Sequence, residues 1–115
     1  MALENLQMVA SDGPRAGQRI LRMKGPLSIH TVFEFQNVVR TETSASLIID
    51  FSGVPFIDSA GLGALVGAHL SAQKSQRKIL LAAMNSQAIT LLEMTRIRSL
   101  FNIYSTLQEA EAAPL

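Results

Sequence analysis

The chain has 115 residues, the length of one ordinary domain, and it has no cysteine, so disulfides, thiolate metal sites and cysteine nucleophiles are excluded. Ten lysines and arginines balance nine aspartates and glutamates, which argues against binding to a nucleic-acid backbone. Hydrophobic residues make up 48% of the chain but aromatic residues only 5%, which fits a folded domain without a stacking surface for single-stranded nucleic acid.

The N-terminal segment and the apolar runs bear on the location of the protein. Residues 1–10 lack the basic start and the apolar run of a signal peptide. The longest apolar stretch, residues 60–70, is shorter than the roughly 18 residues that a membrane span needs. We therefore expect a cytoplasmic protein that does not enter a membrane.

The first part of the chain predicts a hairpin followed by a helix. Residues 6–11 and 18–24 have extended character, and the turn-rich segment between them favours an antiparallel pair. Thr31 and Glu34 then have the spacing of a capping box. Apolar residues at helical spacing follow, so the pattern predicts a helix over residues 32–41.

Strands and helices alternate over the rest of the chain. A continuous apolar run that ends in Asp50 is typical of a buried parallel strand. In the helix predicted to begin near residue 86, Ile89, Leu92 and Met94 are available for the core. The predicted strands cover residues 46–51, 78–83 and 101–104. The helix after the first of these is capped by Asp58 or Ser59 and reaches residue 74, and the helix after the second is opened by Asn85 and Ser86. A short last helix is started by Ser105, with Gln108 in capping-box spacing.

The order of these elements defines a fold class. Strands that alternate with helices imply a mostly parallel sheet covered by helices. We therefore expect a single α/β domain over residues 1–115, with a mixed, mostly parallel sheet of about four to five strands and about four helices.

The most informative segment places a serine at a strand-to-helix junction, in the order Asp58-Ser59-Ala60-Gly61-Leu62-Gly63. The first turn of a helix has unpaired N–H groups and a partial positive charge, which would stabilise a phosphate on Ser59. Phosphorylation would add a charge of about −1.5 to −2 beside the carboxylate of Asp58. A serine at this position can also simply cap the helix. The local pattern leaves both roles open.

The helix that follows carries a stripe of small residues, Ala60, Gly63 or Ala64, Gly67 and Ser71. Glycine within a helix costs about 1 kcal/mol relative to alanine, so several of them suggest a compensating contact. The stripe could pack against a neighbouring helix of the same domain, or it could form a smooth docking face. In the second case it would also allow the chain to form a homodimer.

The junction resembles the signature of the STAS family, the bacterial anti-sigma factor antagonists. That signature is an apolar strand ending in aspartate, here Asp50, followed by a turn and by Asp-Ser-(Ser, Thr or Ala)-Gly-Leu-Gly, here residues 58–63. Gly25-Pro26-Leu27 resembles the Gly-x-Leu step before the first helix. Residues 100–104 and 105–110 resemble the last strand and the end of the domain, so the likeness covers nearly the whole chain.

The resemblance implies a switch in partner choice. The unphosphorylated antagonist binds an anti-sigma factor that is also a serine kinase, and sigma factor is released. The kinase then phosphorylates Ser59 with ATP and binding is lost, until a PP2C-type phosphatase restores the serine. Asp58 would shape the surface that faces the kinase. The positions that the resemblance assigns to partner binding are Asp58, Ser59, Ala60, Gly61, Leu62, Gly63, Gly67 and Ser28.

Ser28 departs from the family pattern. The family often has aspartate after the Gly-x-Leu step, near the phosphorylation loop, whereas this chain has serine. The difference bears on how a kinase would contact the loop. Ser28 could be a second modified site or an ordinary turn serine.

An enzyme is one alternative function, and the sequence argues against it. Ile57 occupies the first glycine position of a Gly-x-Ser-x-Gly nucleophile elbow. His30 and His69 pair with no carboxylate at a recognisable spacing, and we expect His69 to be a partly buried or surface histidine. Metal-ligand spacing and a Gly-Lys-Ser/Thr phosphate loop are also missing. We expect no catalytic residue, no metal site and no cofactor.

The other alternative is a STAS interaction module that does not switch, in a signalling assembly or a lipid-transport complex. The Asp58-Ser59 pair argues against the lipid-transport type, which usually departs from Asp-Ser at the helix start. Equal affinity of a partner for both phosphorylation states would favour such a module.

Overall fold

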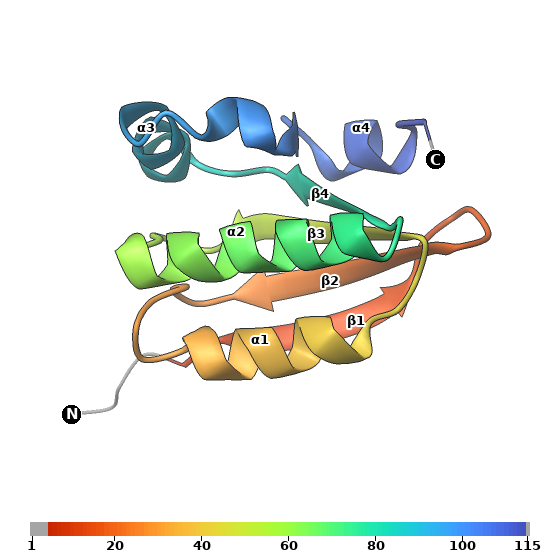
Figure 1. Cartoon of the computed structure of the whole chain (residues 1–115), viewed down its shortest axis with the longest axis horizontal. Coiled ribbons are helices and arrows are strands. Elements are labelled where there is room, and N and C mark those ends of the chain that lie inside the picture. The colour runs from red at the N-terminus through yellow and green to blue at the C-terminus, as the bar shows by residue number, and fades with distance from the viewer. Residues whose placement is uncertain (1–4, 115) are drawn as a thin grey trace.

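Five strands form one sheet in the order β1-β2-β3-β4-β5, as the computed structural model of residues 5–114 shows (Figure 1). The strands are β1 (Gln7–Asp12), β2 (Gln18–Lys24), β3 (Ser46–Gly53), β4 (Lys78–Ala82) and β5 (Asn102–Tyr104). The helices are α1 (Val32–Thr41), α2 (Ser59–Lys74), α3 (Ser86–Met94) and α4 (Leu107–Glu111), with a 3₁₀ turn, η1, over Arg98–Leu100.

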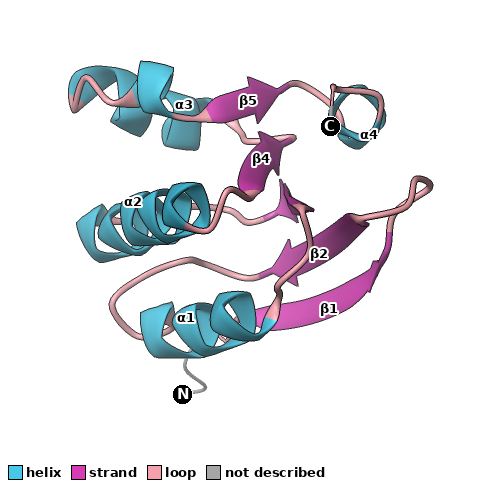
Figure 2. Ribbon diagram, turned by 45° about the vertical axis from the view of Figure 1, so that its right-hand side comes forward, coloured by secondary structure: helices cyan, strands magenta, loops and turns pink. Residues whose placement is uncertain are grey.

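Strand direction agrees with the sequence prediction. β1 and β2 form the antiparallel hairpin, whereas β2, β3, β4 and β5 pair in parallel. The sheet is therefore mixed and mostly parallel, and the predicted α/β class is confirmed. Helices α1, α2 and α3 cover one face of the sheet and α4 lies on the other (Figure 2).

β3 lies at the centre of the sheet, and both of its faces are buried, which explains its continuous apolar run. Its first six residues are all buried, because both faces of this strand are covered. Leu47, Ile49 and Phe51 point into the core below α1, α2 and α3, and Ile48 points into the smaller core below α4. Successive side chains of a strand lie on opposite faces, so the run fills both cores.

The small core on the second face depends on α4. Apolar side chains of three neighbouring strands meet the alanines near the end of the chain, and the set consists of Ile20, Ile48, Leu80, Ala82, Ala110 and Ala113. Residues at the turn of the β1–β2 hairpin form hydrogen bonds with the C-terminal end of the chain. Gln18 Nε2 donates to the carbonyl of Glu111 at 3.0 Å, and Arg15 donates to the carbonyl of Ala113.

The predicted capping box at the start of α1 is wrong, although the helix has the predicted bounds. Thr31 is the N-cap residue but makes no side-chain cap bond. Its hydroxyl is buried and instead donates to the carbonyl of Pro26 at 2.9 Å, and it accepts from the N–H of Ser28 at 3.0 Å. Thr31 therefore ties together the loop before the helix.

The capping box of the last helix is one residue later than predicted. Thr106 is the N-cap in place of Ser105, and Glu109 takes the place of Gln108. The Thr106 hydroxyl accepts from the N–H of Glu109 at 3.1 Å, and the Glu109 carboxylate accepts from the N–H of Thr106 at 3.0 Å. Both pairs have the same spacing, but a carboxylate accepts a stronger hydrogen bond than an amide oxygen.

Met94 is not part of the core, which corrects another prediction. Its side chain is 76% exposed, whereas Leu92 is buried and Ile89 is half-buried. Two residues along a helix correspond to a rotation of about 200°, so Met94 faces away from the side that Leu92 buries.

His69 of α2 is more deeply buried than the sequence indicated, at 4% exposure. Its ring packs edge-on against Phe101, with ring centroids 5.4 Å apart. Within the described residues neither ring nitrogen has a hydrogen-bond partner. Burial therefore lowers the pKa of His69 below its ordinary value of 6.5 and favours the neutral ring.

The fold should consequently lose stability in mild acid. Below pH 6.5 the unfolded chain binds a proton at His69 that the folded chain rejects, so the free energy of unfolding falls as the pH falls through this range. Urea unfolding at a series of pH values measures the slope. His69→Leu should flatten it, and the exposed His30→Gln is the control. An unchanged slope in His69→Leu would contradict the assignment.

No helix in the described part of the chain, residues 5–114, has the length and apolar character needed to cross a membrane.

Candidate functional site

The start of α2 is fixed against the loop that precedes α1. Leu27 pairs with Ile57 in an isolated parallel bridge. The N–H of Leu27 donates to the carbonyl of Phe56, and the N–H of Asp58 donates to the carbonyl of Leu27, both at 3.2 Å. Two chain segments about 30 residues apart thus frame one surface.

Asp58 is the N-cap of α2 and also joins the two segments. One carboxylate oxygen accepts from the N–H of Gly61 at 2.9 Å. The other accepts from the N–H of Ile29 at 3.0 Å. A carboxylate at this position satisfies an unpaired donor of the first turn and interacts favourably with the helix dipole.

Ser59 is the first residue of α2 and is exposed. The cap function belongs to Asp58, so one of the two roles considered for Ser59 is already filled by its neighbour. Within residues 5–114 the Ser59 hydroxyl has no hydrogen-bond partner, in contrast to the hydroxyls of Thr31 and Thr106. The hydroxyl is thus presented to solvent at a helix N-terminus.

The glycines of the motif have different roles. A Cβ atom on Gly61 would lie 2.2 Å from the carbonyl oxygen of Leu27, so only glycine allows this close approach. Gly63 and Gly67 have nothing within 4 Å of that position. In the small-residue stripe, Ala64 is buried in the large core, whereas Gly63 and Gly67 form open surface. Gly61 is not part of that stripe, and its close contact is with the loop before α1.

The remaining predicted site residues are distributed between core and surface. Ala60 is half-buried beside Ser59, and Leu62 is in the large core. Ser28 is 5% exposed, and its hydroxyl accepts from the N–H of His30 at 3.3 Å. Because Ile29 is bonded to Asp58, Ser28 lies in the loop that borders the site. Its contact with a partner stays a prediction.

Asp50, the aspartate at the end of the apolar run, does not belong to this surface. β3 continues three residues beyond it, to Gly53. The Asp50 carboxylate accepts from the N–H of Ser52 at 2.9 Å. In the parallel ladder it is in register with Arg22 and Ala82. It therefore stabilises the end of the strand.

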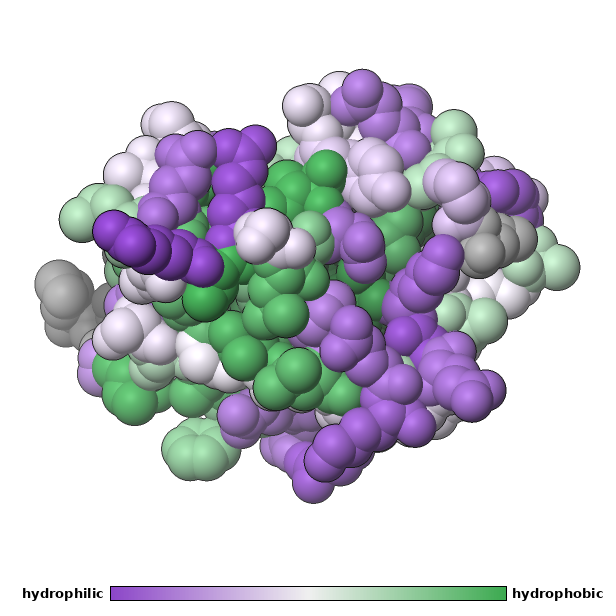
Figure 3. All heavy atoms as spheres, turned by 45° about the horizontal axis from the view of Figure 1, so that its top comes forward, coloured by the Kyte–Doolittle hydropathy of each residue, from purple (hydrophilic) through white to green (hydrophobic). Residues whose placement is uncertain are grey.

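Exposed apolar side chains around the site were not singled out from the sequence. Hydrophobic side chains reach the surface in several places on the face drawn in Figure 3. Ile29 is 59% exposed, Phe33 in the first turn of α1 is 75% exposed, and Phe56 is 38% exposed. The exposure of Phe33 could have been predicted from the sequence, because Phe33 lies outside the apolar stripe of α1 that faces the core.

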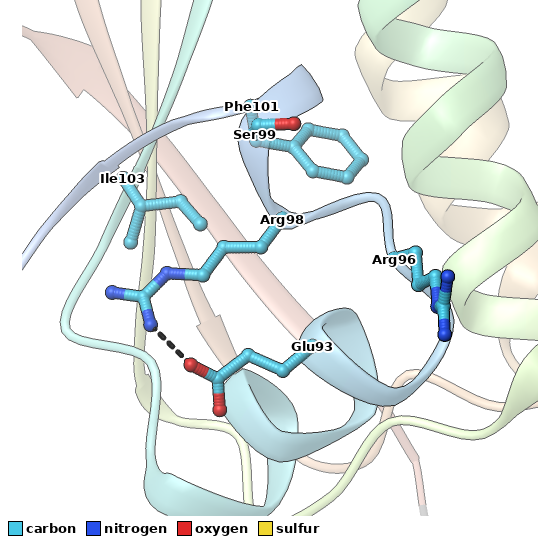
Figure 4. Close-up of a pocket in the computed structure, with 6 residues that line it drawn as sticks. All are labelled: Glu93, Arg96, Arg98, Ser99, Phe101 and Ile103. Carbon is cyan, nitrogen blue, oxygen red and sulfur yellow. Dashed lines mark hydrogen bonds and ion pairs between the residues drawn. The ribbon is translucent and has the colours of Figure 1, made fainter.

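A separate pocket of about 530 Å³ lies beside η1 (Figure 4). The Arg98 guanidinium donates to the Glu93 carboxylate at 2.6 Å, and Arg96 lies apart from this pair. The pocket is lined by residues of α3, η1, β5 and the loops that join them, and by none of the motif. Nor does the described part of the chain contain a group of three or more acidic or histidine side chains that could hold a metal ion.

Comparison with known proteins gives one consistent family. The family model described as STAS domain matches residues 5–110. An anti-sigma factor antagonist from Mycobacterium paratuberculosis superposes with a TM-score of 0.79 at 20% identity, covering 91% of this chain and 90% of that one. The phosphorylated form of the Bacillus cell fate determinant SpoIIAA superposes with a TM-score of 0.67 at 17% identity, covering 91% and 95%.

The same fold also occurs as part of a larger protein. The murine anion transporter Solute Carrier 26 family member A9 matches with a TM-score of 0.72 at 18% identity, covering 94% of this chain but only 22% of the transporter. At these identities the superpositions establish a shared fold.

Proposed function

The chain belongs to the STAS-domain family, and from that premise we propose that it is an anti-sigma factor antagonist regulated by phosphorylation of Ser59. In its unphosphorylated form it binds an anti-sigma factor that is also a serine kinase, and a PP2C-type phosphatase reverses the modification. The chain is a substrate and a binding partner in this scheme, with no catalytic role, and acts in the cytoplasm.

The observation that carries the proposal is that Asp58 caps α2, which leaves the hydroxyl of Ser59 free of that role. Asp58 already caps α2 with one carboxylate oxygen, at 2.9 Å from the N–H of Gly61. The exposed hydroxyl of Ser59 therefore has no evident structural duty and is accessible to a kinase. The similarity in fold to SpoIIAA, a protein whose structure is described in a phosphorylated form, also supports the proposal.

The surroundings explain how one phosphate could change binding without changing the fold. The phosphate would stand at the positive end of a 16-residue helix, where N–H groups of the first turn can donate to its oxygens. The added charge of about −1.5 to −2 would lie next to Asp58 and the exposed apolar side chains of Ile29 and Phe56. A partner docked on those side chains would meet an unpaired charge.

Phosphate incorporation tests the proposal directly. Incubation with an anti-sigma factor kinase of the same organism and labelled ATP should add one phosphate, and Ser59→Ala should abolish it. Ser86→Ala is a matched control, because Ser86 is likewise the exposed first residue of a helix after a side-chain cap, Asn85. Phosphate on Ser28, on Ser86 or on no residue at all would refute the assignment to Ser59.

A module that does not switch is the second candidate. It is favoured by the match to part of an anion transporter, which shows the fold within a larger assembly. If Ser59 accepts phosphate but a partner binds both forms equally, this second function is the correct one.

A further inference from the structure

A groove of about 410 Å³ lies between α1 and α2 and reaches Arg77 and Ile79, at the start of β4. Its floor is apolar and includes Phe35, Val39 and Ala64. Its rim includes Arg40 and Arg77. The motif residues from Asp58 to Gly63 take no part in its lining, so it is a second surface of the molecule.

The groove exists because α2 has no side chain to fill it. Gly67 lies in its wall, and a Cβ atom there would have nothing within 4 Å. Glycine in the middle of a helix costs about 1 kcal/mol relative to alanine, and no internal contact at this position requires it. Gly67 lies about 12 Å along the helix axis from Ser59, at a rise of about 1.5 Å per residue.

The rim of the groove is positively charged. The Arg40 guanidinium donates to Asn37 of its own helix, and Arg77 Nη1 donates to the carbonyl of Glu42 at 2.8 Å. In the described part of the chain neither arginine forms an ion pair, and no carboxylate lines the groove. Both guanidinium groups thus retain donors for a negatively charged ligand.

We propose that the α1–α2 groove binds an acidic amphipathic helix of a partner protein. The apolar face of such a helix would occupy the floor over Val39 and Ala64, and its carboxylates would pair with Arg40 and Arg77. A helix fits because grooves between two packed helices accept the side-chain ridges of a third, and amphipathic helices bind such grooves through residues at helical spacing.

Selection from a phage library of helical peptides, with one face randomised, tests this on the full chain. The enriched peptides should carry apolar residues at i and i+4 with flanking aspartate or glutamate. Fluorescence polarisation should show weaker binding by about tenfold or more for Arg40→Glu, and a steep loss of affinity as salt is raised. Gly67→Leu should abolish binding, because the new side chain occupies the groove.

Matched variants separate the groove from general effects. Gly67→Ala adds only a methyl group and should bind as the wild type does. Lys24→Glu changes the net charge by the same amount as Arg40→Glu but lies at the end of β2, and it should have no effect. Ser59→Asp should also leave peptide affinity unchanged, so this test stands or falls independently of the phosphorylation proposal.

Several results would overturn the inference. These are a failure to enrich any peptide, enrichment of peptides without acidic residues, or binding that survives both Gly67→Leu and Arg40→Glu. Self-association of the chain that Gly67→Leu abolishes in sedimentation would assign the groove to a second copy instead. Binding of octanoate alone would assign it to a small amphiphile. If Gly67→Leu fails to fold, the exposed Arg40→Glu still decides the question.

Discussion

Phosphorylation of Ser59 is expected to weaken binding of the anti-sigma factor by about 100-fold or more. A charge that is buried without a partner at an interface costs about 3 kcal/mol or more, and every 1.4 kcal/mol is about tenfold in affinity. The phosphate would lie beside Asp58, whose carboxylate repels it and already uses both oxygens, on Gly61 and Ile29. The nearest first-turn N–H groups can orient the phosphate but cannot neutralise it fully.

Isothermal titration calorimetry with the phosphorylated and unphosphorylated chains measures this effect. Ser59→Ala should bind nearly as the unphosphorylated wild type does, since the hydroxyl has no partner among the described residues. Ser59→Asp, with a single charge, should fall between the two forms, and Ser86→Asp is the control on an equivalent helix start. Overlapping circular dichroism spectra should accompany the loss of binding. Equal affinities for both forms would leave only the non-switching module.

Alanine at two glycines of the motif should have opposite effects on stability. Gly61→Ala forces its methyl group to within 2.2 Å of the Leu27 carbonyl oxygen. That oxygen is held by the N–H of Asp58 and cannot move away freely. We expect a loss of about 1–3 kcal/mol, typical of overpacking. Gly63→Ala meets no atom and should gain about 0.5–1 kcal/mol from helix propensity.

Urea unfolding measures the difference in the free energy of unfolding between the two variants. Each variant replaces one glycine by alanine, so their compositions are identical. If both variants changed the free energy of unfolding in the same direction, the contact between Gly61 and Leu27 would not be the reason for glycine there. Gly61→Ala should also slow phosphorylation of Ser59, because the clash displaces the first turn of α2 on which the hydroxyl stands.

The elements of the fold were predictable where burial leaves a periodic pattern. The apolar run of β3 required a strand covered on both faces, and the turn-rich segment after β1 required a hairpin. Helix α1 has the predicted bounds because its apolar stripe is unambiguous. β2 also has its predicted bounds, whereas several other boundaries differ by one to two residues, as for β3, which reaches Gly53.

The errors arose where one pattern allows two hydrogen-bond arrangements. Thr31 had cap spacing, but tertiary contacts direct its hydroxyl to Pro26. Thr106 with Glu109 competed with an identical spacing one residue earlier, and only the backbone register decides between them. His69 was expected to be partly buried or at the surface, but it is buried and packs against Phe101, which lies more than 30 residues away.

The candidate site was predictable as a motif but not as a geometry. The order of residues indicated Asp58 and Ser59, yet it could not tell which of them caps the helix. It also gave the same weight to Gly61, Gly63 and Gly67. These residues differ only in what lies opposite them, which depends on the approach of Leu27 and on the position of α1. Long-range contacts of this kind leave no local trace in a sequence.

Among the described residues, only one short helix covers the second face of the sheet, and this bears on how readily the protein aggregates. In the described part of the chain, the apolar side chains of Ile20, Ile48 and Leu80 are shielded by α4, a helix of five residues. Short terminal helices open locally at a much lower free energy than the whole domain unfolds. Each such opening would bare a hydrophobic row across three strands while the larger core stays intact. We therefore expect aggregation of this protein to depend on the fraying of α4, and on the bonds that Arg15 and Gln18 make to the end of the chain, more than on global stability.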